Sequence, residues 1–369
     1  MAPVVAELRK HGGRIESQVC VTGQHRHMLD QVLDLFQIAP DIDLDLMKED
    51  QTLATLTSAA VTAVTAVLEQ VEPDVVLVQG DTTTAMTAAL AAFYLRIPVG
   101  HVEAGLRTGD RYSPFPEELN RRVIDVLATY CFAPTQSAAD ALRAEGVDTA
   151  TVTVTGNTVI DALLDVAGRP PSPRAIELLG PLGLSAAQPP GESDARKHLL
   201  VTAHRRENFG APLEEICRAI RALAEANPDV SITYPVHLNP NVRQPVEQHL
   251  GGVAGVNLIE PLDYEPFVQL MARSYLVLTD SGGIQEEAPA LGVPVLVMRR
   301  ETERPEAIEA GTVKLVGTDS RTIIDETQRL LRDRSAREEM ARAVSPYGDG
   351  HSAERIVGVL LDSAARGGR

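Results

Sequence analysis

The sequence predicts an α/β protein built from two doubly wound, Rossmann-like domains. Its 369 residues, 44% of them apolar, are too many for one compact core and suit two domains of about 150 to 200 residues each. Short β-branched runs alternate with Ala- and Leu-rich helical stretches along almost the whole chain. This alternation is typical of parallel sheets that helices cover on both faces.

The first half of the chain contains five predicted strands with helices between them. They lie near residues 18–22, 74–79, 99–102, 130–133 and 151–154. A doubly wound domain usually opens with a strand at the centre of its sheet, whereas this sequence opens within its first predicted helix. We therefore expect the sheet of the first domain to lack its first strand.

A second alternating series follows a stretch rich in Pro, Gly and Ser over residues 169–192, where we expect a loop and no regular element. Its strands are predicted near residues 198–202, 230–236, 257–259, 275–278, 293–297 and 313–315. We expect an N-terminal domain over residues 1–157 and a C-terminal domain over residues 158–345. The helix of the last segment, 346–369, is expected to cross back to the first domain.

Composition excludes several classes of function. The chain has 34 Lys and Arg against 51 Asp and Glu, and its net charge of −17 disfavours nucleic acids and acidic membranes as partners. The longest apolar runs are of strand length, so we expect no transmembrane helix. The N-terminus lacks the pattern of a secretory signal, which favours a cytoplasmic location. Cys20, Cys131 and Cys217 follow neither metal-ligand nor disulfide spacing, so we expect three buried thiols and no metal site.

Two acids follow neighbouring predicted strands in the first half. Asp81 comes directly after the apolar run 75–78, and Glu103 ends the next strand. Ligands of open α/β sheets bind beyond the carboxyl ends of the strands, and two acids placed there can divide acid and base roles. The alternatives are that Asp81 caps a helix and that Glu103 forms a salt bridge with Arg107.

Glu117 lies in a third candidate segment, residues 114–122, which has proline at the predicted first helical position and acids in the first turn. Complementarity with the helix dipole alone explains that pattern. The segment gains interest because the Gly- and Pro-rich path over residues 105–116 could fold these acids back over the strand ends.

The second half contains two turns that suit a phosphate. A strand runs into His204-Arg205-Arg206, although basic surface turns are common. Downstream, a strand, the turn Asp280-Ser281-Gly282-Gly283 and a helix start predict an anion nest. Glu287, one turn later, could accept hydrogen bonds from a ribose diol, and Arg304 follows a further strand. His237 also follows a strand, where a single histidine is more often structural.

Neither G-x-G-x-x-G nor the Walker pattern occurs, so no nicotinamide or ATP cofactor is expected.

Taken in order, these segments resemble the non-hydrolysing UDP-N-acetylglucosamine 2-epimerases. The resemblance covers about residues 1–357 and rests on G-D-T-T-T at 80–84, H-V-E-A-G-L-R-T at 101–108, P-E-E at 116–118, T-A-H-R-R-E-N at 202–208 and D-S-G-G-I-Q-E-E at 280–287. It implies a GT-B-like architecture, in which two Rossmann-like domains face a central cleft, and a homodimer. It also implies reversible epimerisation at carbon 2 of UDP-N-acetylglucosamine to UDP-N-acetylmannosamine, by elimination and re-addition of UDP without a cofactor, in the synthesis of cell-envelope polysaccharides.

The resemblance also implies roles for single residues. The catalytic set would be Asp81, Glu103, Glu117 and His204. The substrate contacts would be Phe267 near uracil, Ser281, Gly282, Gly283, Glu287 and Arg304 at the diphosphate and ribose, and Gln24 and His25 near the sugar and a regulatory substrate site. Members of the family begin with a strand and a G-T-R-P-E-A-I-K loop ahead of the segment that corresponds to Met1, and this sequence does not contain that loop.

Three other functions fit the same motifs. A hydrolysing epimerase would release N-acetylmannosamine and UDP. A glycosyltransferase of the same architecture would need an acceptor, and a UDP-sugar-binding protein would show no turnover.

Overall fold

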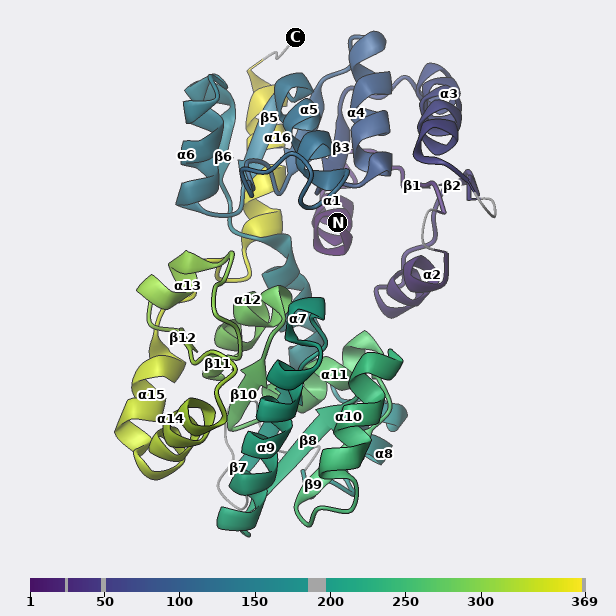
Figure 1. The fold of residues 1–369 in the computed structure, drawn as a ribbon. Helices are drawn as coiled ribbons and strands as arrows, with labels where there is room; N and C mark the ends of the chain where they lie inside the picture. Colours follow the sequence, from purple (N-terminus) through teal and green to yellow (C-terminus); the bar gives the residue numbers. More distant parts are fainter. Residues whose placement is uncertain (24–25, 48–50, 185–196, 367–369) are drawn as a thin grey trace. The chain divides into compact units, whose positions relative to one another are not determined.

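The computed structural model describes residues 1–23, 26–47, 51–184 and 197–366. The chain divides into two compact units, which are described separately (Figure 1). Unit 1 comprises Met1–Ala162 and Tyr347–Arg369, and unit 2 comprises Leu163–Pro346. Both units contain parallel sheets with helices, so the predicted α/β class is confirmed.

Unit 1 contains a four-stranded parallel sheet in the order β3-β4-β5-β6 and a separate two-stranded parallel sheet, β1-β2. Its strands are β1 (Cys20–Val21), β2 (Ile42–Asp43), β3 (Val76–Gln79), β4 (Val99–Val102), β5 (Tyr130–Ala133) and β6 (Val152–Val154). Its helices are α1 (Ala2–Lys10), α2 (Arg26–Leu35), α3 (Leu53–Val71), α4 (Thr83–Tyr94), α5 (Glu117–Leu127), α6 (Gln136–Ala144) and α16 (Ser352–Ala365), while α7 (Thr158–Gly168) begins here and ends in unit 2. Among the described strands, β3 pairs only with β4.

Two expectations for unit 1 were wrong. The strand β2 was not predicted, because a strand of two residues is too short to show an alternation of polar and apolar residues. Cys131 and Cys217 are buried, as expected, but Cys20 is exposed. The short strand β1 points Cys20 outward and buries Val21, since successive side chains of a strand face opposite sides.

Helix α3 bears on the expectation that the chain has no transmembrane helix. It is long and apolar enough to cross a membrane by length and composition, with a mean hydropathy of 1.3. Its buried residues, Leu56, Ala60, Val64 and Leu68, recur at every fourth position. Val64 and Leu68 pack into a cluster with residues of α4. This one-sided burial is typical of a helix on the surface of a folded domain, so length and composition alone are weak support for a membrane span.

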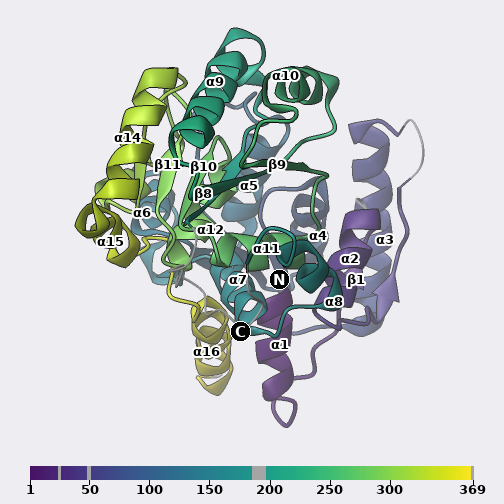
Figure 2. The same ribbon diagram turned by 90° about the horizontal axis from the view of Figure 1, so that it is seen from below.

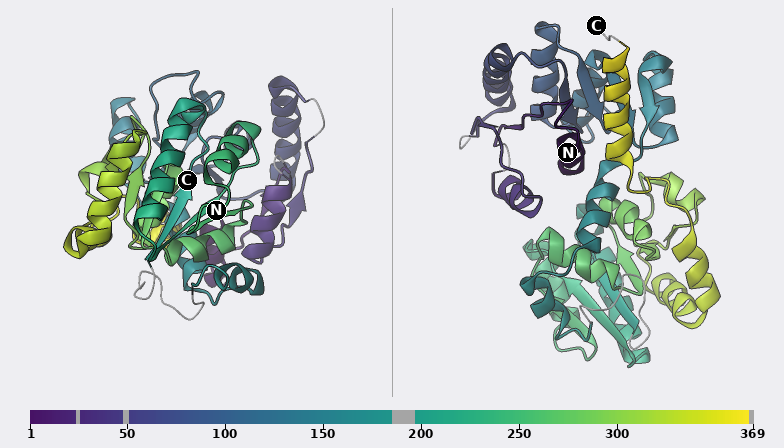
Figure 3. Two further views of the ribbon diagram at one scale, coloured as in Figure 1. Left: turned by 60° about the horizontal axis from the view of Figure 1, so that its bottom comes forward. Right: turned by 180° about the vertical axis from the view of Figure 1, so that it is seen from behind.

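The last helix of the chain belongs to unit 1. Helix α16 lies beside α1, and Ile356 and Val357 share a buried cluster with Val4, Val102 and Phe132 (Figure 3). Residues separated by most of the chain therefore cover one face of β4 and β5.

Unit 2 contains a six-stranded parallel sheet in the order β12-β11-β10-β7-β8-β9. Its strands are β7 (Lys197–Thr202), β8 (Val230–Pro235), β9 (Val256–Ile259), β10 (Leu276–Thr279), β11 (Val295–Val297) and β12 (Val313–Leu315). Its helices are α8 (Pro173–Leu179), α9 (Ala211–Ala226), α10 (Pro240–Leu250), α11 (Tyr264–Ala272), α12 (Gly282–Ala290), α13 (Pro305–Glu309), α14 (Ser320–Arg332) and α15 (Arg334–Arg342). The strand order reverses between β7 and β10, and ligands of open α/β sheets bind at such a reversal.

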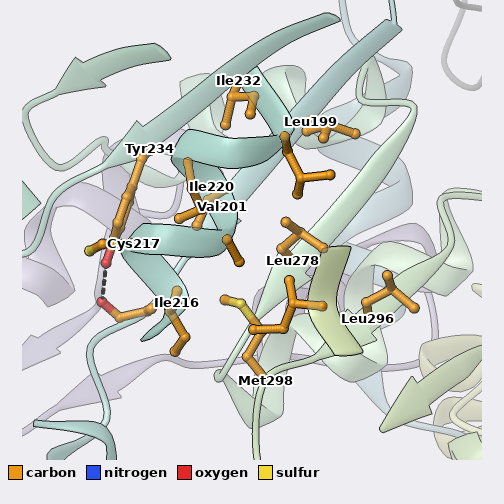
Figure 4. Close-up of a cluster of buried hydrophobic side chains, with 14 of the residues drawn as sticks. Leu199, Val201, Ile216, Cys217, Ile220, Ile232, Tyr234, Leu278, Leu296 and Met298 are labelled. Carbon is orange, nitrogen blue, oxygen red and sulfur yellow. Dashed lines mark hydrogen bonds between the residues drawn. The ribbon is translucent and has the colours of Figure 1, made fainter. Parts of the chain in front are cut away.

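Helices α9, α10 and α14 lie together on one side of this sheet (Figure 2). They bury a large apolar cluster in which Ile216 and Ile220 of α9 meet Leu199 and Leu278 of the neighbouring strands (Figure 4). The hydroxyl of Tyr234 donates to the carbonyl of Ala203 at 2.6 Å, so even this polar atom is satisfied inside the core. The bond links β8 to the turn that follows β7.

Helix α8 contradicts the expectation of a structureless stretch over residues 169–192. Ser172 caps it by accepting a hydrogen bond from the amide of Ala175 at 3.2 Å, and Pro173 occupies its first turn, where no amide donor is needed. Ser172 also binds Glu265 of α11 through its amide at 3.1 Å and its hydroxyl at 2.6 Å. The proline therefore starts a helix here. Residues 185–196 of the same stretch lie outside the described part of the chain.

Candidate functional site

Asp81 lies directly after β3 and is tied to α5. Its carboxylate pairs with the guanidinium of Arg121, and its carbonyl accepts a hydrogen bond from the Asn120 side chain at 2.9 Å. The cap of α4 is Thr82, whose hydroxyl accepts from the amide of Ala85 at 3.2 Å. The alternative that Asp81 caps this helix is therefore wrong, and its carboxylate, 28% exposed, is within reach of a ligand.

Glu103 follows β4 in a conformation that residues with a Cβ rarely adopt, with a φ of 68°. Both of its carboxylate oxygens accept hydrogen bonds from amide side chains. Gln79 donates to Oε2 at 3.1 Å, and Asn157 donates to Oε1 at 3.3 Å. Strained backbone of this kind persists where the surrounding structure holds it, and it often occurs at functional sites.

The alternative salt bridge from Glu103 to Arg107 is wrong. Arg107 pairs instead with Asp125 at 2.8 Å and with Glu145 at 2.7 Å. Asp125 also lies 2.6 Å from Nδ1 of the fully buried His101, whose Nε2 lies 2.8 Å from the carbonyl of Gly80. This network ties β4, α5 and the residue before Asp81 together.

The two acids that follow β3 and β4 lie at one edge of the sheet. Oε2 of Glu103 lies 3.5 Å from where a Cβ would project at Gly80, the neighbour of Asp81 in the chain. The residue at position 80 has a φ of 71°, which glycine adopts without strain. A Cβ there would make an ordinary van der Waals contact with the Glu103 carboxylate, so it is the backbone conformation that favours glycine.

Glu117 is the first residue of α5 and is half-buried. Pro116 is the cap of this helix and not its first residue, so the helix begins one residue later than the sequence predicted. Glu118 is fully buried, accepts from the amides of Thr108 at 3.1 Å and Gly109 at 3.3 Å, and pairs with Arg121 at 3.0 Å. Of the two neighbouring acids, Glu118 therefore anchors the loop after β4, and Glu117 remains accessible.

In unit 2, Asp280 organises the turns that follow β7 and β10. This carboxylate is fully buried, and its Oδ2 accepts hydrogen bonds from the amides of His204 at 2.9 Å and Arg205 at 2.8 Å and from the side chain of Asn208 at 3.0 Å. The His204 ring stacks on that of His237, with centroids 5.6 Å apart. Burial lowers the pKa of His204, against the opposing effect of Asp280.

The first turn of α12 lies where the sequence predicts an anion nest. Ser281 is the cap of the helix, and its hydroxyl makes no capping bond. A Cβ at Gly282 would lie 3.4 Å from Nη2 of Arg205 and 3.9 Å from Nη2 of Arg304, so both guanidinium groups lie close to the N-terminus of the helix. Gly283 is exposed at the same turn. Backbone amides, the helix dipole and two arginines are a suitable environment for a diphosphate.

Glu287 lies one turn further along α12. Burial, together with the neighbouring Glu286, raises the pKa of Glu287 to about 7. Burial, together with the nearby charge of Glu287, raises the pKa of the Tyr264 hydroxyl on α11. Phe267, on the same helix, is half-buried. The residues expected at the nucleoside therefore come from α11 and α12.

Some predicted residues cannot be placed, and others were not predicted. Gln24 and His25 lie outside the described residues. Sequence reasoning missed Gln79, Asn157, Arg121 and the pairing of Arg205 with the helix N-terminus. Gln79 is the last residue of β3 and Asn157 follows β6, so the rule that led to Asp81 and Glu103 could also have singled them out. No group of three or more His, Cys, Asp or Glu residues in the described ranges is arranged to hold a metal ion.

Comparison with known proteins identifies the family. A family model described as UDP-N-acetylglucosamine 2-epimerase matches residues 6–361. The chain belongs to this family. The UDP-N-acetylglucosamine 2-epimerase of Escherichia coli (strain K12) is 54% identical over 363 residues, which cover 98% of this chain and 95% of the relative. That of Salmonella typhimurium is 54% identical over 360 residues, covering 98% and 94%.

Solved structures of 2-epimerases share the fold. The Neisseria meningitidis UDP-GlcNAc 2-epimerase bound to UDP-GlcNAc is 49% identical, with a TM-score of 0.82 and coverage of 98% of this chain and 96% of that chain. The Methanocaldococcus jannaschii enzyme in complex with UDP-GlcNAc and UDP is 32% identical, with a TM-score of 0.73 and coverage of 98% and 95%. The predicted family and the GT-B-like fold class are thereby confirmed.

Proposed function

We propose that this 2-epimerase family member is a non-hydrolysing enzyme that interconverts UDP-N-acetylglucosamine and UDP-N-acetylmannosamine. The proposal assigns the acids of unit 1 to the sugar and the α12 turn of unit 2 to UDP. The observation that carries it is Glu103, a carboxylate in a strained conformation whose two oxygens are held by Gln79 and Asn157 beside the Asp81 turn. The bound UDP-GlcNAc of a 49% identical relative supports the choice of substrate.

The chemistry must begin with departure of UDP. The proton on carbon 2 has no neighbouring carbonyl in the ring, so a carboxylate cannot remove it directly. When the bond from carbon 1 to the UDP oxygen breaks, the electron pair leaves with UDP and positive charge develops on carbon 1. That charge acidifies the C2 proton, a carboxylate takes it, and a glycal results. A proton delivered to the opposite face of carbon 2 and re-addition of the UDP oxygen to carbon 1 then give the epimer.

In this proposal Asp81, Glu103 and Glu117 share the base, acid and cation-stabilising roles. The contacts favour Glu103 as the group that removes the proton. The carboxylate of Asp81 is already engaged in an ion pair with the guanidinium of Arg121. Glu103 is held by two neutral amides, and in the described part of the chain no Lys, Arg or His side chain pairs with it.

The same proposal gives unit 2 the task of holding the leaving group. The amides at Gly282 and the guanidinium groups of Arg205 and Arg304 would stabilise the diphosphate as negative charge builds on it. His204 would contact the same diphosphate. Glu287 would accept from the ribose, and Phe267 would pack on uracil. UDP that stays bound can return to carbon 1, which separates epimerisation from hydrolysis.

The test uses the full chain and UDP-N-acetylglucosamine in deuterated water. We expect UDP-N-acetylmannosamine with deuterium at carbon 2 and no free sugar. Glu103→Gln should abolish exchange, whereas Glu177→Gln, on the exposed surface of α8, should leave it unchanged. Free N-acetylmannosamine with UDP would point to a hydrolysing enzyme, and UDP binding without exchange would point to a binding protein. Near-normal turnover of Glu103→Gln would remove Glu103 from the mechanism.

We further propose a cytoplasmic homodimer. Phe93 and Tyr94, at the end of α4, are 54% and 64% exposed and lie next to each other as an aromatic pair, which suits a protein interface. The three free thiols suit a reducing compartment. Light scattering on the wild type and on a Phe93→Ser, Tyr94→Ser double variant tests the interface: a dimer that becomes a monomer supports it, and an unchanged mass contradicts it.

A further inference from the structure

We infer that Asp280 is a positioning residue for His204: its second carboxylate oxygen holds the proton of the imidazole on Nδ1 and leaves Nε2 as the atom available to the diphosphate. The inference rests on the proposed function only for the identity of the ligand. It concerns a pair of residues within unit 2, both of which lie at the point where the strand order reverses.

The two oxygens of Asp280 have different surroundings. Oδ2 accepts three hydrogen bonds, from the amides of His204 and Arg205 and from the side chain of Asn208. These bonds suffice to hold the turn after β7. Oδ1 is equally buried but has no hydrogen-bond partner among the described residues. A buried acceptor without a donor is costly, so a purely structural role would leave half of this carboxylate unexplained.

Nδ1 of His204 lies 3.6 Å from Oδ1. This distance is slightly longer than a hydrogen bond, and the side chain of His204 is 40% exposed, so a small rotation of the ring closes it. A carboxylate oxygen in this position can only accept a hydrogen bond, so Nδ1 must carry the hydrogen. The neutral ring must then expose an unprotonated Nε2.

The other groups around His204 keep its ring in place. His237 stacks on it at an interplanar angle of 12°, and the Nδ1 of His237 already accepts from the amide of Asn239 at 3.1 Å. Burial lowers the pKa of His204, Asp280 raises it, and His237 and Arg205 lower it further. The free protein therefore holds a neutral His204 at neutral pH, and the choice of tautomer decides which nitrogen meets the ligand.

Diphosphate binding would change this balance. A negative oxygen near Nε2 favours the imidazolium, which takes one proton from solvent and donates Nε2–H to the diphosphate while Nδ1–H donates to Oδ1 of Asp280. The carboxylate would stabilise the charged ring without itself changing protonation. UDP binding should therefore take up a proton at His204 at neutral pH.

The test is nitrogen NMR of the histidine side chains in the full chain, which has nine histidines. His204→Gln identifies the His204 signals. We expect wild-type His204 to be the Nδ1–H tautomer. In Asp280→Asn the side-chain oxygen of asparagine can keep the hydrogen bonds that Oδ2 accepts. The NH₂ group of the asparagine then donates to Nδ1 of His204. His204 should therefore switch to the Nε2–H tautomer, and the pKa of His204 should fall. Asn208→Ala is the matched control, because it removes a donor from Oδ2 and leaves Oδ1 untouched, so the tautomer should not change.

A second measurement separates positioning from the proposed function. Calorimetry of UDP binding in buffers of different ionisation enthalpy should show proton uptake for the wild type that is reduced in Asp280→Asn. The same tautomer in wild type and in folded Asp280→Asn would overturn the inference, whether or not UDP binds. A tautomer switch in a protein that fails to bind UDP would support the positioning role and count against the proposed ligand.

Discussion

Glu287 should make the stability of unit 2 depend on pH in an unusual direction. Burial and the neighbouring Glu286 raise the pKa of Glu287 to about 7 in the folded protein, from an ordinary value of 4.5. The folded state then binds the Glu287 proton more tightly than the unfolded state does. The free energy of unfolding contributed by this group is therefore greatest below pH 4.5, falls as the pH rises through 7, and stays low above it.

The size of the effect follows from the difference between the two pKa values. It corresponds to at most about 3 kcal/mol, and most of this change occurs between pH 5 and pH 8. Glu287→Gln keeps the shape of the side chain and cannot ionise. The variant should resemble the wild type in stability at low pH and should exceed it by up to about 3 kcal/mol at pH 8.

Urea unfolding of wild type and Glu287→Gln at pH 5, 6, 7 and 8 measures this difference. Other titrating groups are common to both proteins and cancel. Glu309→Gln, which removes a charge from the exposed end of α13 in the same unit, is the control and should show no such trend. A stability difference between Glu287→Gln and wild type that is constant from pH 5 to pH 8 would refute the reasoning about burial.

Three further substitutions test other parts of the structure. Asn157→Asp would place a second carboxylate beside Glu103, so the acid limb of the pH profile of kcat/KM should move to higher pH. The control Asn157→Ser should leave that limb close to its wild-type position. An acid limb that does not move in Asn157→Asp would argue against the contact between residue 157 and Glu103. Thr82→Ala removes the cap of α4 and should lower the free energy of unfolding by about 1 kcal/mol in denaturant titrations, and no loss would mean that the cap is dispensable. Ile220→Ala opens a cavity in the core of unit 2 and should lower the free energy of unfolding by about 3 kcal/mol in the same titrations. Ile176→Ala, at an exposed position, should lower it by well under about 1 kcal/mol. Equal losses for the two variants would contradict the burial of Ile220.

The sequence predicted most strands of both units because short β-branched runs that alternate with helical stretches carry a strong signal. It also predicted where Asp81, Glu103 and Ser281 would lie, because the carboxyl ends of parallel strands meet at one edge. It failed where the signal is short or ambiguous. The strand β2 has two residues, and Pro173 reads equally well as a loop residue and as the start of α8.

Pairings between distant side chains could not be predicted. Arg121 is 40 residues from Asp81, and Glu145 is 38 residues from Arg107. A sequence shows which charges exist and does not show which of them meet, since that depends on how α5 and α6 pack. Arg107 is four residues from Glu103 in the chain, but it pairs with Asp125 and Glu145, which are distant in sequence.

The left-handed backbone at Glu103 has a consequence for protein engineering. Glycine or asparagine would relieve strain of about 1 kcal/mol there, so a selection for heat resistance alone would favour replacing Glu103. The gain in robustness would remove the carboxylate on which the proposed chemistry depends. Substitutions at position 103 that raise thermal stability are therefore expected to lower turnover. A mutant library made to raise the stability of this protein should keep Glu103 unchanged.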